Sequence, residues 1–160
     1  MTKGLYVGSF DPITMGHLDI IRQGLLVFDT LHIGIGINPK KTPHFSEEDR
    51  IDLVWESVVE VGLDYKKISV GSYHGSMMAE ARNINATAII RGLRQISDFG
   101  DEFTINGISS RALPDVPMTY FICRQDFLHV SSSSVKEIAS LDEDFSWMVT
   151  KCVSRRFEDG

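Results

Sequence analysis

Apolar residues recur along the chain with two different periods. Leu18, Ile21, Leu25 and Phe28 are spaced three or four positions apart, which predicts the buried face of a helix that starts near residues 16–17. Short runs of β-branched and aromatic residues separate such segments and predict strands. The predicted strands are residues 5–7, 31–37, 67–70, 87–90 and 118–123. The predicted helices are residues 17–28, 46–58, 75–84, 98–113, 131–139 and 144–155.

Strands and helices therefore alternate, which favours a parallel five-stranded sheet with helices on both faces, an α/β fold of the Rossmann-like type. We find no internal repeat or linker, and the length suits a single domain over residues 1–160. Ser46 is expected to be the N-cap of the helix at residues 46–58. Asp98 or Ser97 is expected to cap the helix at residues 98–113. Phe99 and Phe103 are expected to form a core pair, and Trp147 is expected to pack.

Cationic and hydroxyl side chains follow the predicted strands. Ser9 follows the first strand, Lys40 and Lys41 the second, and Arg91 and Arg94 the fourth. A serine cluster at residues 131–134 follows the fifth. Because the carboxyl ends of parallel strands meet at one edge of the sheet, these groups should converge there. Such a set suits a polyphosphate ligand.

The first of these loops carries the strongest local signal. Residues 8–17 read Gly-Ser-Phe-Asp-Pro-Ile-Thr-Met-Gly-His, with Pro12 ending the strand and His17 in the first turn of the helix. A strand, a loop of small residues and a helix N-terminus commonly hold a phosphate. The loop lacks the Gly-Lys-Ser/Thr of a Walker motif and the glycine spacing of a dinucleotide fingerprint.

Composition excludes several classes of function. The formal net charge of −6 argues against general binding of nucleic acid. No apolar run is long enough to cross a membrane. Cys123 and Cys152 are far apart in the sequence and predict reduced thiols in a cytoplasm. The histidines show no paired spacing, so no metal site within the protein is predicted.

Three motifs taken in order resemble a known family. Residues 8–17 resemble the signature of the nucleotidyltransferase superfamily, in which histidine or threonine, any residue, glycine and histidine follow one another. Arg-Gly-Leu-Arg at residues 91–94 and Ser-Ser-Ser-Ser-Val-Lys-Glu at residues 131–137 narrow the resemblance to bacterial phosphopantetheine adenylyltransferases. The similarity runs from about Leu5 to about Leu141.

The resemblance implies a reaction in which ATP and 4′-phosphopantetheine give dephospho-coenzyme A and pyrophosphate, with Mg²⁺. The acceptor phosphate is already an anionic nucleophile, so catalysis reduces to positioning and charge stabilisation. The chain shows no covalent nucleophile, which agrees with direct attack. The resemblance also implies a homohexamer and coenzyme A as a feedback inhibitor.

Residue roles are carried over from matching motif positions. His17, Ser9, Lys41 and Arg91 are expected to be catalytic, with His17 donating to the α-phosphate. Ser9, Lys41, Met77 and Arg91 are expected to bind 4′-phosphopantetheine. The residues expected to bind ATP are Ser9, Phe10, His17, Gly92, Leu93, Arg94, Glu102, His129, Val130, Ser131, Ser132 and Ser133.

Three alternatives remain open at this point. A related adenylyl- or cytidylyltransferase could act on nicotinamide mononucleotide or glycerol phosphate, although Thr14 and the Arg-Gly-Leu-Arg loop favour phosphopantetheine. A nucleotide-binding module without catalysis is opposed by His17 together with the serine loop. A flavodoxin-like electron carrier would be yellow when purified.

Overall fold

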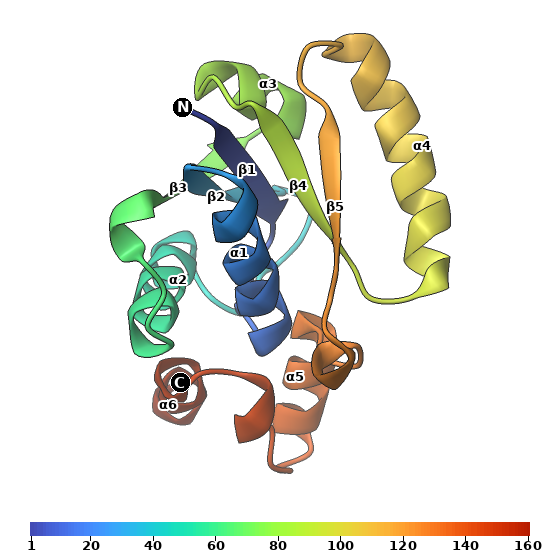
Figure 1. The fold of residues 1–160 in the computed structure, drawn as a ribbon. Helices are drawn as coiled ribbons and strands as arrows, with labels where there is room; N and C mark the ends of the chain where they lie inside the picture. The colour runs from blue at the N-terminus through green and yellow to red at the C-terminus, as the bar shows by residue number, and fades with distance from the viewer.

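The computed structural model describes residues 1–160 and contains one sheet of five parallel strands (Figure 1). Their spatial order is β3-β2-β1-β4-β5. The strands are β1 (Lys3–Gly8), β2 (Thr30–Ile37), β3 (Ile68–His74), β4 (Ala88–Leu93) and β5 (Met118–Ile122). The chain runs outward from β1 to β3, then returns to place β4 on the other side of β1. The predicted five-stranded parallel α/β fold is confirmed.

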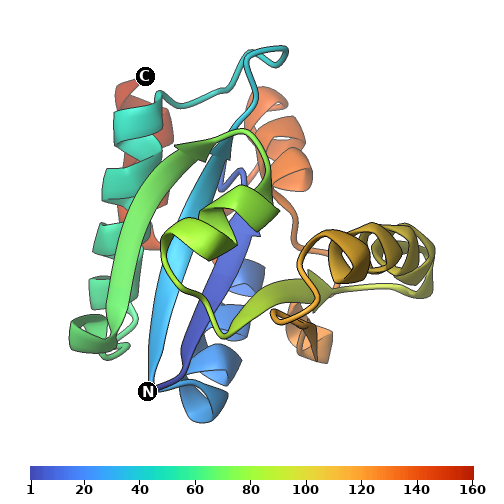
Figure 2. The same cartoon turned by 90° about the horizontal axis from the view of Figure 1, so that it is seen from above.

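Six helices connect and cover the strands. They are α1 (Met15–Val27), α2 (Glu47–Glu60), α3 (Met77–Asn83), α4 (Ile96–Ala112), α5 (Ser132–Ser140) and α6 (Lys151–Asp159). Helices α1 and α2 lie on one face of the sheet, and α6 packs beyond α2 (Figure 1). Helix α3 lies on the opposite face, and α4 flanks β4 and β5 (Figure 2). No helix is both long enough and apolar enough to span a lipid bilayer.

Local sequence explains where several helices begin. The Ser46 hydroxyl accepts a hydrogen bond from the backbone N–H of Asp49 at 3.1 Å, as an N-cap does. Three acidic residues in the first turn of α2 complement the helix dipole. The predicted start of α2 is therefore confirmed in position and in cause.

Several predicted boundaries are wrong, among them the end of β3, which pairs with β2 as far as His74 instead of ending at residue 70. Strand β4 continues through Leu93, because residues 91–93 pair with residues 120–122 of β5, so Arg91 belongs to the strand instead of following it. Helix α4 starts at Ile96 with Gln95 as its N-cap residue, and Asp98 is the third residue of the helix. The predicted helix over residues 144–155 is a short 3₁₀ turn followed by α6.

The two faces of the sheet are covered unequally. The core on the α1 and α2 face contains 24 buried residues, whereas the core beneath α3 and α4 contains six. Phe99 and Phe103 contact each other with ring centroids 5.4 Å apart, but they are 51% and 69% exposed. Trp147 is 60% exposed. The expected core pair of Phe99 and Phe103 is therefore wrong, Trp147 is mostly exposed instead of packed, and α4 carries an apolar outer surface.

Candidate active site

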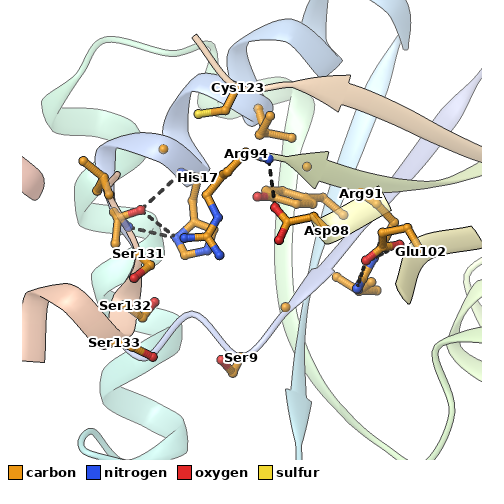
Figure 3. Close-up of a pocket in the computed structure, with 18 of the residues that line it drawn as sticks. Ser9, His17, Arg91, Arg94, Asp98, Glu102, Cys123, Ser131, Ser132 and Ser133 are labelled. Carbon is orange, nitrogen blue, oxygen red and sulfur yellow. Dashed lines mark hydrogen bonds and ion pairs between the residues drawn. The ribbon is translucent and has the colours of Figure 1, made fainter. Parts of the chain in front are cut away.

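A cavity of about 370 Å³ opens where the strand order reverses, beyond the carboxyl ends of β1 and β4. Ligands bind at this switch point in open α/β sheets. Figure 3 shows polar side chains from four separate segments turned toward the cavity. Its lining includes Tyr6, Ser9, Thr14, Gly16, His17, Ile20, Arg91, Gly92, Arg94, Asp98, Asp101, Glu102, Cys123, Val130, Ser131, Ser132 and Ser133.

Three helices present their N-terminal ends to this cavity. Thr14 caps α1, Gln95 precedes α4, and Ser131 caps α5 by accepting a hydrogen bond from the Ser134 backbone N–H at 3.0 Å. Residues from the first turn of each helix line the cavity. Free backbone N–H groups and the positive end of the helix dipole favour anions at such positions. The arrangement suits several phosphate groups.

His17 is held in one tautomer by the residue that caps its helix. The backbone N–H of Thr14 donates to Nδ1 of His17 at 3.0 Å, and the Thr14 hydroxyl accepts from the His17 backbone N–H at 3.4 Å. Because Nδ1 is an acceptor, the ring proton lies on Nε2. Burial, with a smaller contribution from Arg94, lowers the pKa of His17 to about 4. His17 is therefore a neutral Nε2–H donor at neutral pH.

Arg91 is held by a carboxylate on α4. Its Nε lies 3.1 and 3.0 Å from the two oxygens of Glu102, and its Nη2 lies 2.6 Å from Oε1 (Figure 3). Glu102 is buried, and the Tyr120 hydroxyl donates to its backbone carbonyl. This two-point contact fixes the plane of the guanidinium group and leaves Nη1 free of the carboxylate.

Arg94 lies at the turn into α4. Its backbone N–H donates to Oδ2 of Asp98 at 3.0 Å, and the N–H of Gln95 donates to the same oxygen at 3.3 Å. The side chain of Arg94 extends beside His17 (Figure 3). Its charge contributes to the lowered pKa of His17. Asp98 thus orders the turn that carries Arg94 into the cavity.

The first loop is anchored from several directions. The carboxylate of Asp11 accepts hydrogen bonds from the backbone N–H groups of His44 and Phe45, each at 2.8 Å. Arg50 donates to the Ser9 carbonyl at 3.1 Å, and the Ser132 hydroxyl donates to the Pro12 carbonyl at 2.7 Å. The loop is therefore tied to the loop after β2, to α2 and to the start of α5.

Most residues predicted from the sequence for the site meet in the cavity. Those that line it are Ser9, His17, Arg91, Gly92, Arg94, Glu102, Val130, Ser131, Ser132 and Ser133. Gly92 leaves needed room, since a Cβ there would lie 3.0 Å from Cγ1 of Ile20. The two arginines thus approach the same space as His17, although Arg91 does so from within its strand.

Five predicted residues do not line the cavity. Lys41 lies in an exposed loop, so the predicted convergence of lysines with arginines is not seen. Phe10 adopts a φ of 46° and turns its ring into the core, 4.8 Å from the His17 ring. Leu93 is buried in its strand, and His129 is exposed. Met77 packs against the small core beneath α3. Their roles in binding stay predictions.

Sequence reasoning missed several residues of the cavity wall. Tyr6, Ile20 and Cys123 read as ordinary core residues in their strands and helix, and nothing in the local pattern marks them as lining a cavity. Thr14 and Asp98 were recognisable as helix-start residues. The signal for the role of Thr14 was its position three residues before His17, which is the spacing of a capping box.

Sequence comparison with known proteins finds similarity to phosphopantetheine adenylyltransferases. A cytidylyltransferase-like family model matches residues 5–138. A phosphopantetheine adenylyltransferase of Desulforamulus reducens is 36% identical over 159 residues, covering 99% of this chain and 96% of the relative. Its counterpart from Caldanaerobacter subterraneus subsp. tengcongensis is 38% identical, covering 98% and 95%. The one from Wolbachia pipientis wMel is 39% identical, covering 94% and 88%.

Solved structures share the fold at much lower sequence identity. A putative nicotinate-nucleotide adenylyltransferase from Vibrio parahaemolyticus superposes with a TM-score of 0.72 at 16% identity, covering 97% of this chain and 91% of that one. A bifunctional NMN adenylyltransferase/ADP ribose pyrophosphatase from Francisella tularensis gives a TM-score of 0.75 at 16% identity, covering 99% and 50%. These similarities concern the fold alone.

Proposed function

The chain belongs to the phosphopantetheine adenylyltransferase family, and from that premise we propose that it transfers the adenylyl group of ATP to 4′-phosphopantetheine. The products are dephospho-coenzyme A and pyrophosphate. One observation of the site supports this reaction most directly. A neutral imidazole donor, two guanidinium groups and three helix N-termini face a single cavity, and such groups bind and stabilise phosphate charge.

The chemistry follows from the groups present. An oxygen of the acceptor phosphate attacks the α-phosphorus of ATP, a new P–O bond forms, and the bond to the β-phosphate oxygen breaks as pyrophosphate leaves. The nucleophile is already anionic, so no side chain has to remove a proton. The protein contributes orientation and stabilisation of the charge on the α-phosphate oxygens.

We assign roles within this scheme to three side chains. His17 donates from Nε2 to an α-phosphate oxygen, and its hydrogen bond strengthens as negative charge accumulates in the transition state. Glu102 accepts from Nε and Nη2 of Arg91, and Arg91 binds the acceptor phosphate through the remaining edge of the guanidinium group, which carries Nη1. Arg94 acts on the nucleotide, with Ser131, Ser132 and Ser133 at the start of α5 beneath the β- and γ-phosphates.

We propose that Mg²⁺ enters bound to ATP. No group of three metal-ligating side chains occurs in the chain. In the cavity, Glu102 pairs with Arg91 and Asp98 orders the start of α4, which leaves Asp101 as the carboxylate without a partner. Mg²⁺ usually keeps several waters and uses one or two carboxylates besides substrate phosphates, so this set fits. When bound, the ion neutralises part of the phosphate charge.

A panel of acceptors tests the proposed substrate. The protein is incubated with ATP and Mg²⁺ and with 4′-phosphopantetheine, nicotinamide mononucleotide or glycerol phosphate, and pyrophosphate release and the nucleotide product are measured. We expect release with 4′-phosphopantetheine and formation of dephospho-coenzyme A. Release with another acceptor alone would move the chain to a different specificity within the superfamily, and no release with any acceptor would favour a binding module.

Three further properties belong to the same proposal. The protein is expected to form a homohexamer, and the exposed apolar residues of α4 support association between copies of the chain. Coenzyme A is expected to inhibit it by occupying the site through the part it shares with the product. The two free cysteines agree with a reducing cytoplasm.

A further inference from the structure

Tyr6 lies in β1, two residues before the strand ends at Gly8, and has no role in the scheme above. Its side chain is 4% exposed, and its ring packs edge-on against Phe10 with centroids 5.3 Å apart. Its hydroxyl extends toward Gly92, where an added Cβ would lie 3.8 Å from the phenolic oxygen. Tyr6 also lines the cavity. The hydroxyl therefore reaches the wall of the site between β1 and β4.

The Tyr6 hydroxyl has no hydrogen-bond partner in the protein, whereas the Tyr120 hydroxyl donates to the Glu102 carbonyl at 3.2 Å. The side-chain atoms that are both sealed from solvent and unpaired are the hydroxyl oxygens of Thr30 and Ser109. The Tyr6 oxygen thus stays open to the cavity that the residue lines. A buried phenol usually finds a partner for its O–H. Here that partner has to come from a molecule in the cavity.

The charges around Tyr6 indicate the kind of partner. Arg91 and Arg94 both act electrostatically on its hydroxyl, and the ring of His17 lies 6.3 Å from the tyrosine ring. Burial is the largest influence and raises the pKa of Tyr6, so the O–H keeps its proton throughout the physiological range. A protonated donor that lines the same cavity as these two guanidinium groups lies where the positive charge favours an anion.

The position of Tyr6 on the sheet indicates that its hydroxyl meets the nucleotide and not the acceptor. Tyr6 belongs to the core on the α1 side, together with Val130 at the start of the serine loop. His17 and Ser131 to Ser133 line the cavity from the N-termini of α1 and α5 on this side. Arg91, by contrast, pairs with Glu102 on α4. Resting on the proposed function, we propose that the Tyr6 hydroxyl donates a hydrogen bond to a phosphate oxygen of the bound nucleotide.

Replacement of Tyr6 by phenylalanine tests this contact, because Tyr6→Phe removes the hydroxyl and keeps the packed ring. Dissociation constants for ATP and for 4′-phosphopantetheine are measured separately by calorimetry, with thermal unfolding as a further readout. Tyr65→Phe, which alters a half-exposed tyrosine outside the cavity, is the control. We expect Tyr6→Phe to weaken ATP binding about tenfold. Binding of 4′-phosphopantetheine should change less than twofold, and the melting temperature should match that of the control.

Other outcomes overturn the contact. Unchanged ATP affinity would show that the hydroxyl does not meet the nucleotide, and an equal loss for both ligands would show a general change of the cavity. A large drop in melting temperature, or a variant that does not fold, would show a structural role for the hydroxyl. Failure of the proposed function is distinguishable, because the wild-type protein would then form no dephospho-coenzyme A whatever Tyr6→Phe does.

Discussion

At the scale of single residues, the site depends on how neighbouring backbone and side-chain groups orient His17 and Arg91. The Thr14 N–H fixes His17 as an Nε2–H donor, and the two oxygens of Glu102 fix the plane of Arg91. Each contact gives direction to a group that would otherwise rotate. Preorganised donors of this kind stabilise developing charge without reorganising during the reaction.

Replacing His17 should affect turnover more than binding. We expect His17→Ala to lower kcat by roughly 100-fold or more, with a much smaller effect on the KM of either substrate, because the donor matters mainly in the transition state. His17→Gln places an amide N–H near the position of Nε2 and should recover part of the loss. Steady-state kinetics measures both. A His17→Ala enzyme with nearly normal kcat would contradict the assigned role.

His17 should also make stability depend on pH. Its pKa falls from 6.5 to about 4 on folding. Between these two pH values the unfolded chain therefore binds a proton at His17 that the native protein does not bind. Stability is therefore full above pH 6.5 and falls as the pH drops toward 4, by about 3 kcal/mol for this group. Urea unfolding of wild type and His17→Gln across this range checks it. The variant should lose less stability, and parallel curves would show that His17 is not buried neutral.

The two arginines should act on different substrates. Each makes charge-assisted hydrogen bonds worth roughly 1.5–3 kcal/mol, so Arg91→Ala should raise the KM for 4′-phosphopantetheine by roughly 10- to 100-fold and that for ATP much less. Arg94→Ala should do the reverse. Lysine replacements should recover activity only partly, because a point charge lacks the planar fork. Kinetics with each substrate varied in turn decides; weakening of the same substrate by both variants would refute the division.

Sequence predicted the residues whose positions follow from strand ends and helix starts. Such positions that also line the cavity are Ser9, His17, Arg94, Ser131, Ser132 and Ser133. The sequence could not place Lys41, because it lies in the exposed part of the loop between Ile37 and Glu47, where no periodic pattern fixes the conformation. Tyr6 was out of reach because an aromatic residue in a strand predicts burial, and only the structure shows that its hydroxyl reaches a cavity.

At the scale of elements, apolar periodicity gave the type and order of the main strands and helices but not their ends. Strand β4 extends three residues further because its partner β5 continues, which is information from a distant segment. The segment from Asp144 onward reads as one helix, yet Asp144 accepts a hydrogen bond from the Ser146 N–H at 2.9 Å and closes a local turn. Such side-chain contacts compete with helix formation.

The contact between the first loop and the loop after β2 should be measurable in stability. Asp11→Ala would leave the N–H of His44 and the buried N–H of Phe45 without their acceptor, so we expect a loss of about 2–4 kcal/mol. Asp11→Asn retains one acceptor oxygen and should lose less. Urea denaturation gives the values, with Asp52→Ala on the exposed surface of α2 as the control. Equal stability of Asp11→Ala and the control would show that the carboxylate does not hold these loops together.

At the scale of the whole molecule, the two faces of the sheet differ in how well helices cover them. The α1 and α2 face has the larger core and, through α6, a second layer of helix (Figure 1). The α3 and α4 face has a small core, and α4 buries only Glu102 and Ser109. The helix that orients Arg91 thus buries no apolar side chain within its own chain. An assembly that covers α4 would supply the missing support.

The outer surface of α4 should therefore control both assembly and acceptor binding. Phe103 and Ile108 are 69% and 60% exposed on α4, a poor arrangement for a lone monomer. We expect light scattering to give a mass near that of a hexamer of the 17.9-kDa chain. Phe103→Glu and Ile108→Glu should each lower that mass, whereas Leu26→Glu, at an exposed site on α1, should not.

Loss of assembly should then weaken acceptor binding, because Glu102 on α4 orients Arg91. A dissociated Ile108→Glu variant should bind 4′-phosphopantetheine at least about threefold more weakly while its affinity for ATP stays close to normal, because α4 orients Arg91 whereas α1 and α5 provide the nucleotide's side of the cavity. Calorimetry with each ligand measures the split. A wild-type protein that scatters as a monomer across micromolar concentrations would refute the assembly, and a dissociated variant with normal acceptor binding would show that α4 holds Arg91 without a neighbour.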